Sequence, residues 1–224
     1  MSRRGQRVPE AAPLVGLVLA FSVALFGYLF APPQTLLPIF LLALLSVYGF
    51  TAYAIVRSPD PAAVIPPDIV LAAGFLSAGL LCGYGLVVAG QPMFGLFVGL
   101  VAGTLPALYH ARYGERVNPL DADGTFTAAL AVAAIVLVVG GPVVGDPAMA
   151  VLDAVVVVLA AADYRDVRGT PLSDLAEFTL VAATLGGAAL AVIYFSFVAA
   201  DPVLGLLVGG SLLAVGAFFA IGDR

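Results

Sequence analysis

The distribution of positive charge constrains this chain most, because all nine cationic residues lie on one side of a pattern of apolar segments. We expect eight segments, at Leu14–Phe30, Leu36–Val56, Ile69–Ala89, Met93–Tyr109, Thr125–Gly140, Ala148–Ala162, Leu175–Ala199 and Val203–Ile221. The cations are all arginine: Arg3, Arg4, Arg7, Arg57, Arg112, Arg116, Arg165, Arg168 and Arg224. Because cytoplasmic loops retain Arg and Lys, the pattern predicts a polytopic membrane protein with both termini cytoplasmic.

The overall composition excludes an ordinary soluble protein. Hydrophobic residues make up 62% of the chain and the mean hydropathy is +1.11. Crossing about 30 Å of hydrocarbon takes about 20 apolar residues, and most of the segments are near that length. The segments and their short connections use nearly all of the sequence. We therefore expect an all-α fold of eight transmembrane helices, forming one integral membrane domain over residues 1–224 in the cell membrane.

The residue types that carry most enzyme chemistry are scarce. Cys82 is the only cysteine and His110 the only histidine, so neither an internal disulfide nor a metal site of Cys and His is available. Ser211 follows two glycines, as some nucleophiles do, but it lies inside an apolar segment far in sequence from the single imidazole. There is no Gly-Lys phosphate loop and no basic surface for nucleic acid. We expect no enzymatic activity, no cofactor and no nucleic-acid partner.

Prolines recur near the segment starts with a regular spacing. Those on the arginine-bearing side are 54, 52 and 52 residues apart, and those on the other side are 54, 55 and 55 apart: Pro13, Pro67, Pro119, Pro171 and Pro38, Pro92, Pro147, Pro202. Tyr113 and Tyr164 also align if one residue is inserted. The spacing predicts four tandem helical hairpins, at residues 13–56, 67–110, 119–163 and 171–222. Helices of equal length that each place proline in the first turn would give the same spacing without duplication.

Small residues recur at intervals of four on three of the segments. They are Gly95, Gly99 and Gly103, then Ala150 and Ala154, then Gly205 and Gly209. Lipid supplies no hydrophobic drive between helices, so close backbone approach must supply dispersion contacts. We interpret these residues as helix-packing positions inside the bundle; a homodimer face is the alternative.

Asp153 is the one acid placed well inside a segment. It lies six residues after Pro147, roughly 9 Å along a helix. The corresponding positions of the other hairpins hold Leu44, Val98 and Val208. A charged group there costs at least about 2.5–3.5 kcal/mol, and such residues usually face the bundle interior or a water path. Asp153 is therefore the candidate proton- or cation-binding group; the alternative is a neutral or hydrogen-bonded acid that fixes helix packing.

Two further features are candidates for conformational or transport roles. Pro106 lies in the second half of its segment, where it frees the carbonyl of Ala102 and predicts a kink; it is a hinge candidate, or it marks a fraying end whose carbonyl is solvated by water. The Thr104 hydroxyl is expected to bond back to Leu100 or Val101 rather than to rescue that carbonyl. The two segments of the third hairpin are the shortest, at about 16 residues each, as in some transporter substrate sites. The alternative, which we favour, is that flanking residues such as Leu120 and Pro142 complete these spans.

The composition resembles that of membrane proteins from extremely halophilic archaea. The chain has a net charge of −5, arginine without lysine, and spans rich in Ala, Val and Gly. Molar salt would screen the acidic surface within about 3 Å. The resemblance covers the whole chain and indicates no family.

Two functional classes fit these features. The scarcity of polar residues in the spans favours a non-catalytic membrane subunit or scaffold, with the lipid bilayer and a membrane or cytoplasmic protein as partners. The alternative is a small permease or channel in which Asp153 is the proton- or cation-linked group.

Overall fold

A computed structural model describes residues 7–169, 174–198 and 200–221. Its elements in chain order are α1 (Arg7–Phe30), η2 (Pro33–Thr35), α2 (Leu36–Arg57), α3 (Pro61–Val64), α4 (Pro67–Tyr84), η3 (Gly85–Ala89), α5 (Pro92–Tyr113), α6 (Ala122–Val138), η4 (Val139–Val143), α7 (Pro147–Arg168), α8 (Asp174–Ile193), η5 (Tyr194–Val198) and α9 (Pro202–Ile221). Within these ranges the chain forms helices and turns and no strand.

Seven helical stretches in the described part are long and apolar enough to cross a membrane. They are Ala11–Phe30, Pro33–Arg57, Pro67–Ala89, Pro92–Tyr113, Ala122–Val143, Pro147–Arg168 and Phe178–Val198. Only helices and closed barrels satisfy their backbone polar groups in hydrocarbon. Together with the many exposed large apolar side chains, these helices indicate a membrane-embedded protein. The last expected segment is α9, a helix of 20 residues without a charged side chain.

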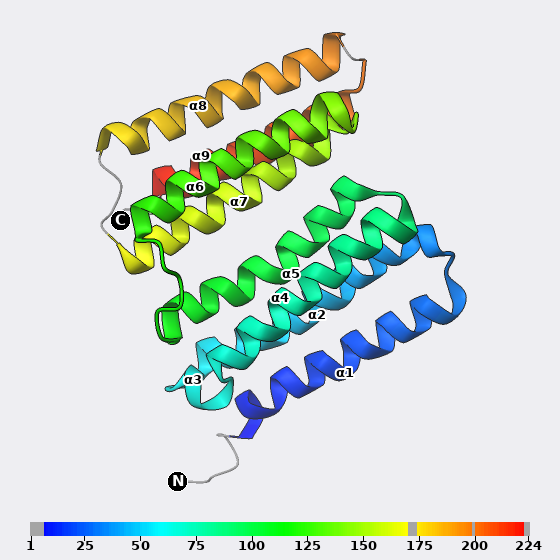
Figure 1. Cartoon of the computed structure of the whole chain (residues 1–224), viewed down its shortest axis with the longest axis vertical. Coiled ribbons are helices and arrows are strands. Elements are labelled where there is room, and N and C mark those ends of the chain that lie inside the picture. The colour runs from blue at the N-terminus through cyan, green and yellow to red at the C-terminus, as the bar shows by residue number, and fades with distance from the viewer. Residues whose placement is uncertain (1–6, 170–173, 199, 222–224) are drawn as a thin grey trace. The chain divides into compact units, whose positions relative to one another are not determined.

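The chain divides into two compact units, Met1–Val117 and Asn118–Arg224. In the first unit α1 packs against α2, α4 packs against α5, and α2 also touches α5. In the second unit α6 packs against α7, α8 packs against α9, and α7 touches α9. The long helices of each unit therefore pack as two pairs, and each pair joins helices that follow one another in the chain (Figure 1).

Three of the turns between helices share one backbone design. In each, the first helix ends in a five-residue π-helical segment, namely η3, η4 and η5. A residue with positive φ follows, at Gly90 (65°), Gly145 (81°) and Ala200 (55°). The next residue donates its N–H to the carbonyl six residues earlier, over 2.7–2.8 Å: Gln91 to Gly85, Asp146 to Gly140 and Asp201 to Phe195. The sequence did not predict the π-helical segments, which satisfy carbonyls that would otherwise face hydrocarbon at the helix ends.

The helix boundaries correct several sequence expectations. α1 begins at Arg7 and contains Pro13, so that proline does not start the helix. α6 begins at Ala122 rather than beside Pro119, because the Asp121 carboxylate accepts a hydrogen bond from the backbone N–H of Gly124 and caps the helix. The spans of the third hairpin are completed by flanking residues, Pro142 among them, so they are not short. Its two helical stretches, Ala122–Val143 and Pro147–Arg168, are each 22 residues long, as is Pro92–Tyr113.

The small residues singled out in the sequence are all buried. The backbone of Gly95 lies directly against that of Gly85, and Gly99 lies against Cys82. On α9, a Cβ at Gly209 would come within 2.5 Å of the Val192 side chain of α8. These glycines therefore lie against the preceding helix of their own pair, where any side chain would separate the backbones.

The left-handed position at Ala200 gives a direct test of the shared turn. Replacing Ala200 with Gly should raise the free energy of unfolding in detergent by about 0.5–1 kcal/mol, because glycine removes the steric penalty of positive φ but costs chain entropy. Ala189→Gly, at an exposed helical position of α8, should lower it by about 1 kcal/mol. If both substitutions destabilise equally, Ala200 does not adopt the positive φ.

Candidate functional site

The candidate site is the carboxyl of Asp153, which α7 places inside the membrane-spanning region. Asp146 caps α7 by accepting a hydrogen bond from the Met149 backbone N–H at 3.2 Å, and Pro147 occupies the first helical position. Asp153 follows six residues later, roughly 9 Å into the helix. It lies on the same face as Ala150 and Ala154, both of which are buried.

The Asp153 side chain is completely enclosed by protein. Its exposed fraction is 0%, and neither carboxyl oxygen has a hydrogen-bond partner among the described residues. The residues six positions after Pro92 and Pro202 are Val98 and Val208, with exposed fractions of 0% and 1%. Asp153 thus occupies a position that is filled by apolar side chains on α5 and α9.

This environment strongly disfavours an ionised carboxylate. Burying a charge without a partner costs far more than a folded protein gains from most single contacts, so the proton remains on the group unless water or a cation reaches it. A carboxylic acid without fixed partners can exchange a proton while its helix stays in place. The described residues hold no cluster of three or more His, Cys, Asp or Glu side chains suited to a metal ion.

Pro106, the second candidate, lies inside a continuous α5 rather than at a broken helix. The carbonyl of Ala102, which proline leaves without its helical donor, accepts a hydrogen bond from the Tyr48 hydroxyl of α2 at 2.9 Å. A Cβ on Gly74 of α4 would come within 2.5 Å of the Pro106 ring. The expected solvation of this carbonyl by water is therefore wrong, because a side chain from a neighbouring helix replaces the missing N–H. The Thr104 hydroxyl bonds to Leu100 at 2.7 Å, as the sequence predicted.

Two acid–base pairs join helices at the ends opposite the π-helical turns. Nε2 of His110 on α5 lies 2.9 Å from Oδ1 of Asp68 on α4. Nε of Arg165 on α7 lies 2.6 Å from Oδ1 of Asp123 on α6. The partners are 42 residues apart in both pairs. In each pair the base is largely buried and the acid is exposed, so each acid contacts a base held between two helices.

Sequence reasoning identified Asp153 and Pro106 but missed the residues that pair with other groups. Tyr48 carries no local signal, because it lies 54 residues from the carbonyl that it satisfies. The acid–base pairs did have a signal, the equal spacing of Asp68–His110 and Asp123–Arg165. Asp153 and Pro106 belong to different units of the chain.

No protein-family model, no curated protein and no solved structure matches this chain.

The Tyr48–Ala102 hydrogen bond can be isolated with a double-mutant cycle. Tyr48→Phe should lower the free energy of unfolding by about 1–3 kcal/mol, because it leaves a buried carbonyl without a donor. In a Pro106→Ala background the backbone N–H at position 106 becomes available to Ala102, so the same substitution should cost clearly less. Unfolding in detergent measures both. Tyr28→Phe, at a side chain that is 70% exposed, is the control. Equal costs in the two backgrounds would contradict this role for Tyr48.

Proposed function

We propose that this protein is a small proton-linked permease of the cell membrane, in which Asp153 binds and releases the proton. The observation that carries the proposal is the enclosed Asp153 carboxyl without a hydrogen-bond partner in the described part of the chain. An acid that served only to fix helix packing would gain its stabilising effect from hydrogen bonds to a neighbouring helix. Asp153 instead has the properties of a group whose protonation changes during a cycle.

A proton suits this site better than a metal cation. Calcium and magnesium need several oxygen ligands at fixed distances, whereas a proton needs only one carboxyl oxygen. Asp153 is a single acid among small apolar residues such as Ala150 and Ala154. Protonation gives a neutral acid that burial favours, and deprotonation requires that water or a substrate group reach the carboxylate.

A non-catalytic membrane subunit or scaffold is the second candidate function, and one observation favours it. Several hydroxyl side chains within the spans bond to a carbonyl of their own helix: Ser22 to Val18, Ser46 to Leu42, Thr104 to Leu100 and Thr184 to Leu180. Such hydroxyls are not directed towards a polar solute. In this case Asp153 would be a neutral packing residue, and the membrane or cytoplasmic partner would bind elsewhere.

We further propose that α9 is the eighth span and that residues 61–221 contain three copies of one helical hairpin. The support is a repeated spacing of 55 residues. It separates Gly90, Gly145 and Ala200, and it separates the hydrogen bonds that follow them. The same spacing separates the two acids and the two bases of the acid–base pairs in the first two copies. Copies of two spans keep one orientation, so the arginines and both termini would share the cytoplasmic side.

Asp153→Asn tests the proton-linked function directly, because Asn preserves the shape of the side chain but does not titrate. In proteoliposomes with an internal pH-sensitive dye and an imposed potassium-diffusion potential, the wild-type protein should pass protons. Asp153→Asn should abolish that flux while the protein stays folded. Infrared titration of the purified protein should show a carboxylic-acid band that is absent in the variant.

The control for this test is Asp146→Asn, which keeps the α7 cap and should leave the flux unchanged. Asp153→Leu matches the apolar residue at the equivalent position of the first hairpin. If Asp153→Asn and Asp153→Leu both keep the flux and the infrared band, the proton-linked proposal is wrong and the scaffold function is the better one.

The proposed sidedness can be measured with single cysteines in a Cys82→Ser background. Val144→Cys, in the turn before α7, should react with a membrane-impermeant maleimide in intact cells, because that side carries no arginine. Glu115→Cys, after α5, should react only after lysis. The reverse pattern of labelling would overturn the proposed orientation.

A further inference from the structure

The long helices of the second unit carry no positive charge at the depth of Asp153. The sequences of α6, α8 and α9 contain no lysine, arginine or histidine. On α7 the bases are Arg165 and Arg168, both in its last turn, and Nε of Arg165 contacts Asp123. An ionised Asp153 therefore finds no countercharge in the described part of this unit and has to take one from outside.

The hydroxyl groups of the neighbouring helices are already bonded. Each threonine of α6 and α8 donates to the carbonyl four residues earlier, over 2.7–2.9 Å: Thr125, Thr127, Thr179 and Thr184. α7 has neither serine nor threonine. These hydroxyls offer no donor to a polar solute, so a substrate at Asp153 would be recognised by charge and by apolar contact with side chains such as Ala150 and Ala154.

The charge balance of the second unit favours a cation. Residues 118–221 contain nine acids and two arginines, whereas residues 7–117 contain four acids and four arginines. A surface with an excess of one sign raises the local concentration of ions of the opposite sign. The unit that holds Asp153 therefore attracts cations and repels anions.

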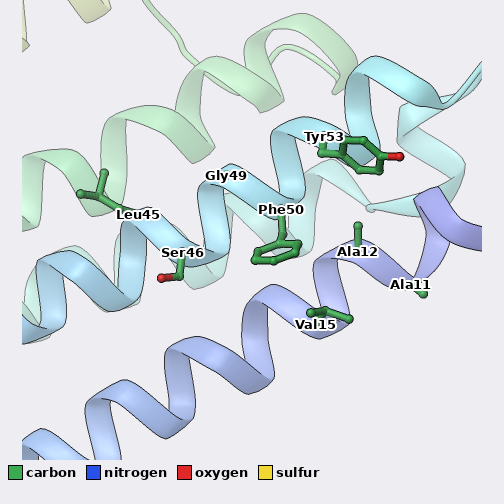
Figure 2. A pocket seen from close by; sticks show the side chains of 8 residues that line it. All are labelled: Ala11, Ala12, Val15, Leu45, Ser46, Gly49, Phe50 and Tyr53. Carbon is green, nitrogen blue, oxygen red and sulfur yellow. The ribbon is translucent and has the colours of Figure 1, made fainter.

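The first unit contains space but no charge that could hold an ion there. An apolar groove of about 710 Å³ lies between α1 and α2, and its walls include Val15 and Phe50 (Figure 2). None of its lining residues is an acid or a base, and the Ser46 hydroxyl in its wall bonds to the Leu42 carbonyl at 2.9 Å. A charged substrate therefore finds its counterion at Asp153 and not in this groove.

We infer that the substrate exchanged for the proton at Asp153 is a lipophilic monovalent organic cation, such as a quaternary ammonium or phosphonium ion. This inference rests on the proposed proton-linked function. Such a cation carries positive charge but no N–H, so it needs no acceptor beyond the Asp153 carboxylate, and its hydrocarbon groups replace apolar contacts. Ammonium has several N–H donors, and metal cations need several oxygen ligands, which one carboxylate among apolar side chains does not supply.

The exchange keeps the site neutral in both of its states. The proton leaves the Asp153 carboxyl for water and the carboxylate takes the cation; on the other side of the membrane the cation leaves and a proton from water restores the neutral acid. Neither state leaves an unpaired charge inside the protein. Within the second unit, α7 packs less extensively against α9 than the helices of each pair pack against one another. Separation of the two pairs would therefore admit a substrate to α7 with less loss of contact than separation within a pair.

Calorimetry of the full-length protein in detergent tests this inference with two probes of nearly the same shape, tetraphenylphosphonium and tetraphenylborate. The wild-type protein should bind the phosphonium cation at least about tenfold more tightly than the borate anion, because only the cation pairs with the carboxylate. In weakly buffered solution, binding of the cation should release protons, and the borate should release none. Asp153→Asn should weaken cation binding at least about tenfold, whereas Asp146→Asn, which keeps the α7 cap, should bind like the wild-type protein.

The proton-flux measurement in proteoliposomes separates this inference from the function on which it rests. If the flux depends on Asp153 but the phosphonium cation binds no more tightly than the borate, the substrate class is wrong and the proton-linked function stands. If the flux does not depend on Asp153 and cation binding releases no proton, the function is wrong and the inference fails with it. Cation binding that is unchanged in a folded Asp153→Asn protein would overturn the site. The comparison of the two probes and the proton release use the wild-type protein alone, so they decide even if the variant does not fold.

Discussion

The structure depends on one constraint: every backbone polar group that lies in hydrocarbon needs a partner within the protein. Continuous helices meet most of this requirement, and the exceptions show how the rest is met. At the π-helical turns, carbonyls such as that of Gly85 accept hydrogen bonds from residues beyond the helix end. At Pro106, where proline removes a donor, the Tyr48 hydroxyl supplies a replacement. Leaving either group unpaired would cost about 1–3 kcal/mol or more.

Hydropathy predicted the helical class and the positions of the spans well, because apolar length is what the bilayer selects. Hydropathy predicted the ends of the helices less accurately. The polar run after Ala162 predicted the end of a helix, yet α7 continues to Arg168. Helices continue through the head-group layer, where the Arg165 stem covers apolar surface and its guanidinium reaches Asp123. The same extension bears on the sequence alignment of Tyr113 with Tyr164. Because α5 and α7 have equal lengths, Tyr164 occupies the helix position of Tyr109 rather than that of Tyr113.

Tertiary partners were beyond sequence reasoning for a physical reason. Tyr48 and Ala102 are 54 residues apart, and only helix packing brings them within 2.9 Å. The small residues were more predictable. Glycine destabilises a helix, so Gly95 and Gly99 indicated positions where a neighbouring helix packs closely. The π-helical segments have no distinctive composition: they include Gly85-Leu-Val-Val-Ala89 and Tyr194-Phe-Ser-Phe-Val198, which share no residue type other than valine. Their common feature is the positive-φ residue that follows.

The contrast between Asp153 and its apolar counterparts is the observation that most supports a functional role for this acid. Val98, Asp153 and Val208 each lie six residues beyond a helix-starting proline, and each is enclosed by protein. Valine fills such a position with dispersion contacts and no polar cost, whereas aspartate brings two oxygens that the described surroundings leave without partners. Packing alone would therefore favour valine at position 153. The acid at this position therefore supports the proposal that Asp153 binds and releases a proton, which valine cannot do.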